Sequence, residues 1–241
     1  MRIVGKTDTG LVRKTNQDDF ACGLFPDGNA WAVVCDGMGG VNGGSVASTK
    51  AVGIISESIK KGYDGNTDLA SVKRLIGSAI TEGNKGVYQT ALNDPSLFGM
   101  GTTVIACIAT PQNAYVAHAG DSRAYIAGKS GIVLLTRDHS IVQEMLESGK
   151  LKPEEAVNHP QRNIITRALG VEEELNIDFC ETTFADGSTV LICTDGLTNV
   201  VEESEILKVI RGETDDTAGA LIETANKNGG TDNITVVLID K

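Results

Sequence analysis

Residues 33–40 read VVCDGMGG, an apolar run that ends in one aspartate followed by a glycine turn. Residues 191–196 read LICTDG and repeat this arrangement further along the chain. A carboxylate at the end of a buried strand costs stability unless a cation or hydrogen-bond donors meet it. The two stretches therefore raise the question of which cation Asp36 and Asp195 face.

The spacing of apolar residues around these stretches predicts an α+β fold. Short apolar runs bounded by turn residues predict strands at 1–7, 19–25, 31–35, 175–183, 189–194 and 234–239, and four closely spaced runs over 102–135 predict an antiparallel meander. Helical periodicity is seen at 47–59, 67–92, 202–211 and 215–228. Because strands and helices fall in separate blocks, we expect two packed sheets with helices outside them.

The composition is that of a soluble globular protein. The chain has 241 residues, of which 41% are hydrophobic, and a formal net charge of −11, which argues against non-specific binding to nucleic acid or to anionic membranes. No apolar run approaches a membrane span, the N-terminus lacks a signal-peptide pattern, and the five cysteines form no Cys-x-x-Cys pair. We expect a cytoplasmic, monomeric protein with reduced cysteines.

Aspartates recur at the ends of the predicted strands. The set consists of Asp18, Asp36, Asp121, Asp195 and Asp232, each next to small or glycine residues. Taken singly, each is an ordinary turn residue. If the strand ends converge, mutual repulsion makes the cluster untenable without cations, and oxygen ligands suit Mg²⁺, Mn²⁺ or Ca²⁺ rather than Zn²⁺ or copper. Gly37 permits close approach of the backbone, so its carbonyl is a further candidate ligand.

One arginine stands close to this set in the sequence. Arg13 lies five residues before Asp18, within TDTGLVRKTNQDDF. The planar guanidinium matches the geometry of phosphate oxygens, so an arginine beside a metal–carboxylate cluster is a candidate phosphate-binding residue.

Eight segments in order complete the pattern. They read TDTGLVRKTNQD, VVCDGMGG, GMGTTVIACI, AHAGDSRAY, LTRDHS, ITRALG, LICTDGLTN and GGTDNITVV. Together they resemble the bacterial branch of the type 2C metal-dependent protein serine/threonine phosphatases, the PPM family, over residues 7–237. No single segment is decisive, and the signal lies in their order and spacing.

The resemblance implies a four-layer αββα sandwich and a role for each candidate residue. It implies one catalytic domain over 1–241, with a mobile flap at about 140–169 beside the cleft. Asp36 would bridge two metal ions, Gly37 would offer its carbonyl, and Asp195 and Asp232 would complete one site. Asp18 would act directly or through water, Asp121 would share a third, looser metal position with Asp195, and Arg13 would hold the substrate phosphate.

The resemblance also implies an activity. The protein would hydrolyse phosphoserine and phosphothreonine in proteins by attack of a hydroxide that bridges two Mn²⁺ or Mg²⁺ ions, and it would oppose a bacterial Ser/Thr kinase. The sequence departs from the family at Val41, where many relatives carry a histidine, so no proton donor can be named there. His139 is expected to orient its loop, and His118 to lie in the core.

Two other classes of function are compatible with parts of the sequence. DGMGG superficially resembles the Asp-x-Gly-x-Gly turn of histidine-kinase-type ATP-binding domains, but Met38 stands where that motif needs glycine, and no Walker loop is present. The other alternative is a non-enzymatic relative that keeps the fold and serves as a binding module. Every expected ligand position is aspartate, which favours an enzyme.

Overall fold

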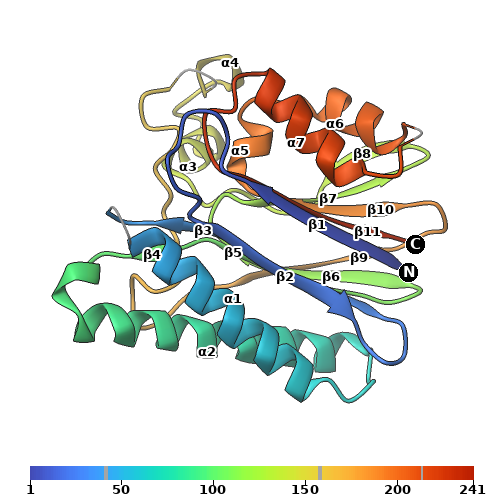
Figure 1. Ribbon diagram of the computed structural model, residues 1–241, viewed down its shortest axis with the longest axis horizontal. Coiled ribbons are helices and arrows are strands. Elements are labelled where there is room, and N and C mark those ends of the chain that lie inside the picture. The colour runs from blue at the N-terminus through green and yellow to red at the C-terminus, as the bar shows by residue number, and fades with distance from the viewer. Residues whose placement is uncertain (41–42, 157–158, 213) are drawn as a thin grey trace.

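The computed structural model describes residues 1–40, 43–156, 159–212 and 214–241. Two antiparallel sheets pack face to face at its centre (Figure 1). One sheet has the order β1-β11-β10-β7-β8, with β1 at Arg2–Asp8, β7 at Arg123–Gly128, β8 at Gly131–Leu134, β10 at Thr189–Cys193 and β11 at Ile234–Asp240. The other has the order β2-β3-β5-β6-β9, with β2 at Asp18–Leu24, β3 at Ala30–Met38, β5 at Val104–Ala109, β6 at Asn113–Ala119 and β9 at Asp178–Thr183, and the short β4 (Gly101–Thr102) pairs with β3.

Helices cover the outer face of each sheet (Figure 1). The β2-β3-β5-β6-β9 sheet is covered by α1 (Gly43–Gly62) and α2 (Leu69–Asn93), and the 3₁₀ turn η1 (Pro95–Leu97) follows α2. The other sheet is covered by α5 (Asp195–Thr198), α6 (Glu203–Ile210) and α7 (Thr217–Lys227). The predicted αββα sandwich is confirmed. Among the described helices, none combines the length and apolarity needed to cross a bilayer.

The period-two alternation of the strands builds the core. Along β3, Val33 and Cys35 pack in the cluster under α1 and α2, whereas Val34 packs in the cluster between the two sheets. A further cluster joins β10 and β11 to α6 and α7. Each fully buried aliphatic side chain contributes about 1.5–3 kcal/mol relative to exposure, so strands buried on both faces hold their ends firmly in place.

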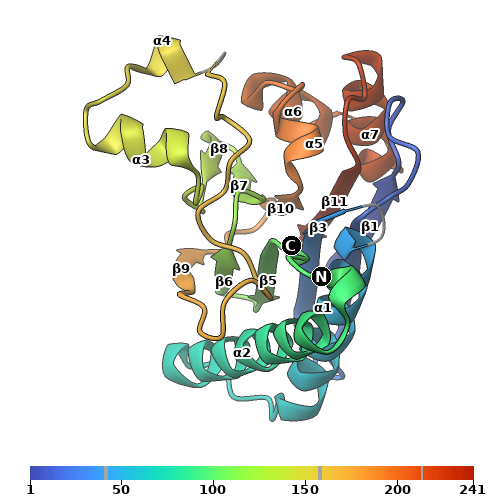
Figure 2. The ribbon, with the colours of Figure 1, turned by 90° about the vertical axis from the view of Figure 1, so that its left-hand side faces the viewer.

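The segment between β8 and β9 stands apart from these layers. It carries α3 (Ile141–Glu147) and α4 (Pro153–Ala156), and in Figure 2 these helices project from one end of the sandwich. An antiparallel bridge between Ser140 and Ile165 closes its base: Ile141 N donates to Ile164 O at 3.0 Å, and Thr166 N donates to His139 O at 2.8 Å.

The predicted meander over 102–135 is wrong in one respect. β5 pairs with β6 and β7 pairs with β8, but β6 and β7 belong to different sheets, so the chain crosses between sheets at Gly120–Ser122. Gly120 has a φ of 113°, and a Cβ there would collide with Thr103. A glycine turn of this kind looks the same in sequence whether the next strand returns beside the last one or passes to the facing sheet.

Smaller differences lie near the site. The strand expected over 175–183 begins at Asp178, and the chain after β10 forms the short helix α5, which the sequence pattern did not predict. The departure at Val41, with the neighbouring Asn42, lies outside the described residues.

Candidate metal centre

The strand ends that carry the candidate aspartates converge. Asp36 lies near the end of β3, Asp121 in the crossing turn, Asp195 at the start of α5, and Asp232 just before β11. These four side chains line one cleft of about 370 Å³ together with Arg13 and Gly37. Asp18 is not part of the cleft wall, but it is buried and stands directly opposite Asp36 in the β2–β3 register. The structure thus brings all the predicted site residues to one place.

The two carboxylate oxygens of Asp18 have different surroundings. Its Oδ2 accepts hydrogen bonds from the hydroxyls of Thr235, at 2.7 Å, and Thr194, at 2.9 Å. Its Oδ1 is buried and has no hydrogen-bond partner within the described residues. A buried carboxylate oxygen without a donor is costly, so its position beside Asp36 points to a cation as the partner.

Asp36 is fixed through its backbone by two threonines. Its N–H donates to Thr103 Oγ1 at 2.9 Å, and its carbonyl accepts from Thr103 N and from Thr102 Oγ1, each at 2.8 Å. These bonds set the direction of the Asp36 side chain without using its carboxylate. The Asp36 side chain lines the cleft, where its carboxyl is within hydrogen-bonding reach of Asp195.

Gly37 occupies a position that admits no side chain. A Cβ there would collide with the carbonyl oxygens of Gln17 and Gly44. The loop before β2 and the start of α1 can therefore approach the end of β3 closely. This is the close backbone approach that the glycine after Asp36 suggested.

The carboxylates perturb one another. Burial, and then the neighbouring carboxylates, raise the pKa of Asp36 well above its usual range, and they raise the pKa of Asp195 as well. Burial is also the largest cause that raises the pKa of Asp18 and that of Asp121, each to about 7. A cluster of this kind is electrostatically unfavourable at neutral pH until positive charge enters it.

Arg13 supplies part of that charge. Its Nη2 donates to Asp232 Oδ2 at 2.7 Å, and this bond is the largest cause that raises the pKa of Arg13. The side chain is half exposed, with 52% of its surface accessible, and lines the cleft. Its guanidinium thus lies at the mouth of the carboxylate cluster with donors that remain accessible to a ligand.

Several polar residues that support the site were not recognised from the sequence. Asn233 ties the loop that carries Arg13 to the start of β11: its Nδ2 donates to Thr9 O and Thr15 O, and its Oδ1 accepts from Gln17 N. Thr194 and Thr235 are the donors to Asp18 described above. The only sequence signal for these residues was that each lies close to a candidate aspartate: Thr194 within CTDG, and Asn233 and Thr235 within TDNIT.

The raised pKa of Asp18 leads to a prediction for the metal-free protein. Its pKa of about 7 in the folded state lies above the value of about 3.9 in unfolded chains, so the protonated form stabilises the fold. That stability is complete below about pH 4 and is lost as the pH rises through about 7. Asp18→Asn, which has no charge, should therefore raise the free energy of unfolding in EDTA by about 1–3 kcal/mol at pH 8 and by much less at pH 5.

Urea unfolding at the two pH values measures this difference. Asp19→Asn is the matched control, because Asp19 is the next residue of β2 and its Oδ1 accepts a hydrogen bond from Phe20 N. A stabilisation by Asp18→Asn that is the same at pH 5 and pH 8 would contradict the raised pKa of Asp18.

The donor set fits divalent cations of the Mg²⁺ and Mn²⁺ type. It consists of carboxylates with one candidate carbonyl, and it includes an unpartnered buried oxygen on Asp18. Hard cations prefer such oxygen ligands, and their charge would relieve the repulsion that raises the carboxylate pKa values. The fold and the site therefore define a class of protein. It is a two-sheet sandwich with a candidate carboxylate metal centre at one end of the strands.

Comparison with known proteins identifies the family. The family model described as protein phosphatase 2C matches residues 12–235. The chain is 37% identical over 241 residues to the serine/threonine phosphatase stp of Listeria monocytogenes, covering 98% of this chain and 94% of that protein. It is 35% identical over 242 residues to the protein phosphatase PhpP of Streptococcus pneumoniae, covering 99% and 97%. The chain belongs to the protein phosphatase 2C family.

Solved structures agree with this assignment. The serine/threonine phosphatase of S. agalactiae superposes with a TM-score of 0.92 at 34% identity, covering 99% of this chain and 98% of that one. The catalytic domain of the serine/threonine protein phosphatase PstP, solved in complex with two manganese ions, superposes with a TM-score of 0.84 at 31% identity, covering 99% and 97%.

Proposed function

We propose that the aspartate cleft is the active site of this chain and that Asp36, Gly37, Asp195 and Asp232 hold two Mn²⁺ or Mg²⁺ ions there. As a member of the protein phosphatase 2C family, the chain is a metal-dependent serine/threonine protein phosphatase that acts on phosphoproteins. The observation that carries the site assignment is the buried Oδ1 of Asp18 beside Asp36, which has no hydrogen-bond partner in the part of the chain that the structure describes. The ionised form of such a carboxyl is stabilised by positive charge close by.

Each residue of the cleft has a task in this proposal. The bound cations supply Lewis-acid chemistry, which activates water and neutralises phosphoryl oxygens. Thr102 and Thr103 fix the backbone of Asp36, whose carboxylate would hold the cations. Arg13 binds the substrate phosphate through donors not used by Asp232, and its planar fork matches two phosphoryl oxygens.

A third, looser cation position is assigned to Asp121. Asp121 lines both the 370 Å³ cleft and a neighbouring cavity of about 320 Å³, and Asp195 and Asn163 line both as well. The position therefore lies toward the segment 140–169 rather than between the sheets. That location suits an ion whose binding depends on how the segment is placed.

The segment 140–169 serves as the flap of the domain in this proposal. Asn163 and Ile165 line the cleft, so a bound peptide would contact this segment next to the phosphate. Loops held at the rim of an active site commonly set substrate choice and access. We assign the physiological substrates to phosphoproteins that include a Ser/Thr kinase of the same cell, and we expect a monomeric enzyme built as one catalytic domain.

Hydrolysis of a phosphothreonine peptide tests the proposed function. The EDTA-treated protein should be inactive, and activity should return on addition of Mn²⁺. The same peptide carrying phosphotyrosine should be hydrolysed at least about tenfold more slowly, because its phosphate stands farther from the peptide backbone. Absence of turnover at any Mn²⁺ concentration would contradict the enzyme and favour a binding module with the same fold.

A further inference from the structure

His139 joins the crossing turn to the segment 140–169. Its Nδ1 accepts from Gly120 N at 3.1 Å, and its own N–H donates to Gly120 O at 3.0 Å. Both backbone polar groups of Gly120, the residue before Asp121, are therefore hydrogen-bonded to His139. The carbonyl of His139 also accepts from Thr166 N at 2.8 Å, where the segment returns to the body of the protein.

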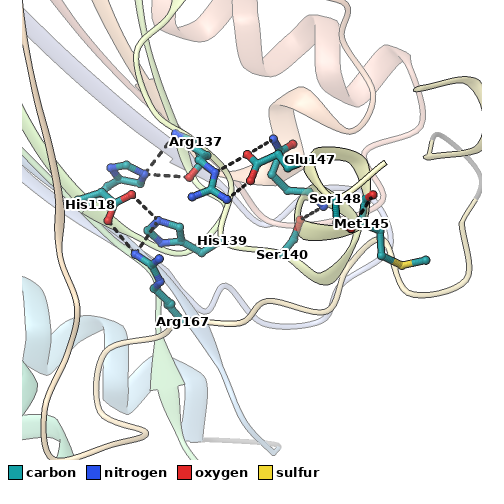
Figure 3. Close-up of polar contacts among 10 residues, drawn as sticks. His118, Arg137, His139, Ser140, Met145, Glu147, Ser148 and Arg167 are labelled. Atoms are coloured by element: carbon teal, nitrogen blue, oxygen red, sulfur yellow. Dashed lines mark hydrogen bonds and ion pairs between the residues drawn. The ribbon is translucent and has the colours of Figure 1, made fainter. Parts of the chain in front are cut away.

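These bonds require one tautomer of the imidazole. A backbone N–H always donates, so Nδ1 must be the bare nitrogen and the proton must lie on Nε2. Burial lowers the pKa of His139, which keeps the ring neutral at pH 7. His118 stacks on the ring with 4.8 Å between centroids and keeps it in place (Figure 3).

Asp178 is the group that selects this tautomer. Its Oδ2 lies 3.2 Å from His139 Nε2 and accepts the proton there, while its Oδ1 accepts from Arg167 Nη1 at 2.7 Å. Arg167 Nη1 is also 3.2 Å from His139 Nε2, but two donors do not bond, so the guanidinium acts on Asp178. Arg167 thus keeps Asp178 ionised and in place as the acceptor (Figure 3 shows His139 beside Arg167).

The same side chains could be read as a metal site. Ligand atoms of His118, His139 and Asp178 lie within 4.8 Å of one another. Arg167 argues against a cation there, because its guanidinium already neutralises Asp178 and would repel a metal ion. The cluster is better explained as a support for the Gly120–Asp121 turn.

The support extends along the segment. Arg137, two residues before His139, bonds His118 Nε2 through its backbone and forms a bidentate ion pair with Glu147 at the end of α3 (Figure 3). Ser140, the residue after His139, caps α3 by accepting from Gln143 N at 3.2 Å. The start of the segment therefore continues directly from the residue that holds Gly120.

We propose that His139 is a positioning residue for Asp121, that Asp178 and Arg167 fix the tautomer it needs, and that the turn carrying Asp121 and the base of the segment 140–169 are thereby held as one unit. The inference rests on the proposed function, because it concerns the third cation position assigned to Asp121. Loss of the bond to Gly120 should loosen that position and leave the two ions at Asp36 in place.

Two substitutions of His139 distinguish the roles of its two ring nitrogens. His139→Asn puts an amide oxygen where Nδ1 stands and keeps the acceptor for Gly120, whereas His139→Gln reaches toward Asp178 and leaves Gly120 N–H without its partner. His159→Asn is the matched control, since His159 Nδ1 also accepts a backbone N–H within the same segment, from Gln161 at 3.2 Å.

Calorimetric titration with Mn²⁺ alone gives the first readout. His139→Gln should weaken the weakest binding step about tenfold, because a buried amide loses its acceptor, while the tighter steps stay within about threefold. His139→Asn and His159→Asn should match the wild type in all steps. Equal weak-step affinities for His139→Gln and His139→Asn would overturn the inference.

Nitrogen-15 spectra of labelled histidine give a readout that does not depend on activity or metal. The wild type should show His139 with its proton on Nε2, and Asp178→Ala should populate the other tautomer and speed exchange of the Gly120 amide at least about tenfold. Asp178→Asn should restore both, because its amide oxygen can accept from Nε2. A wild-type His139 with its proton on Nδ1, or Gly120 exchange that Asp178→Ala leaves unchanged, would overturn the proposal.

The two proposals fail in different ways. If the wild type bound no Mn²⁺, the proposed function would fall and the positioning role with it. If the wild type binds Mn²⁺ and hydrolyses phosphothreonine, but the His139 variants do not differ in the weak step, the positioning role alone is wrong.

Discussion

Asp36→Asn should abolish phosphatase activity while the protein stays folded. The side chain keeps its shape and its backbone bonds to Thr102 and Thr103, but it loses the charge that would bind both cations. We expect the rate of phosphothreonine peptide hydrolysis at saturating Mn²⁺ to fall at least about a thousandfold, which corresponds to about 4 kcal/mol of lost transition-state stabilisation.

The same variant should be more stable than the wild type in the absence of metal, although it is less active. Because burial, and then repulsion from Asp18 and Asp195, raises the pKa of Asp36, removal of its charge should increase the melting temperature in EDTA. Addition of Mn²⁺ should stabilise the wild type and have little effect on Asp36→Asn. Asp19→Asn should behave as the wild type in both assays. An Asp36→Asn enzyme with more than a tenth of wild-type activity would contradict the assigned role.

Arg13→Ala should lower kcat/KM for phosphopeptides by about 10- to 100-fold, because a charge-assisted bond to the phosphate is lost. The same substitution should not weaken the binding of Mn²⁺. Arg13 donates to Asp232 in the cleft, so its removal frees a proposed metal ligand and takes away a neighbouring positive charge. Mn²⁺ affinity should therefore be unchanged or tighter.

Steady-state kinetics and Mn²⁺ titration of the same preparation measure both quantities. Arg74→Ala is the matched control, since Arg74 lies on the outer helix α2, where it contacts Ser71. Weaker Mn²⁺ binding by Arg13→Ala, or unchanged kcat/KM, would show that Arg13 supports the metal site rather than the substrate phosphate.

The fold was largely predictable because its periodicities are strong. Alternating residues along β3 pack in two different clusters, and a helix face at i+4 spacing packs beneath the same strand. The crossing at Gly120 was not predictable, since the choice between two sheets is made by packing over the whole of β7 rather than by the turn. That crossing is what places Asp121 in the turn that joins the two sheets.

The candidate ligands were also visible in the sequence, but their supports were not. A strand that ends in aspartate and glycine is a local signal, whereas the bonds to Asp18 come from residues 176 and 217 positions away. The same holds for His139: its motif indicated an orienting role, but the bond to Gly120 and the choice of tautomer depend on Asp178, which is 39 positions distant. Such long-range polar contacts leave no periodic trace.

Anomalous diffraction from crystals grown with Mn²⁺ tests the central claim most directly. We expect two strong peaks in the cleft, both in contact with Asp36, with Asp195 and Asp232 among the remaining ligands and Arg13 turned toward the open side. A weaker peak beside Asp121 would mark the third position. Peaks confined to other places, such as the cluster of His118, His139 and Asp178, with none at Asp36, would contradict it.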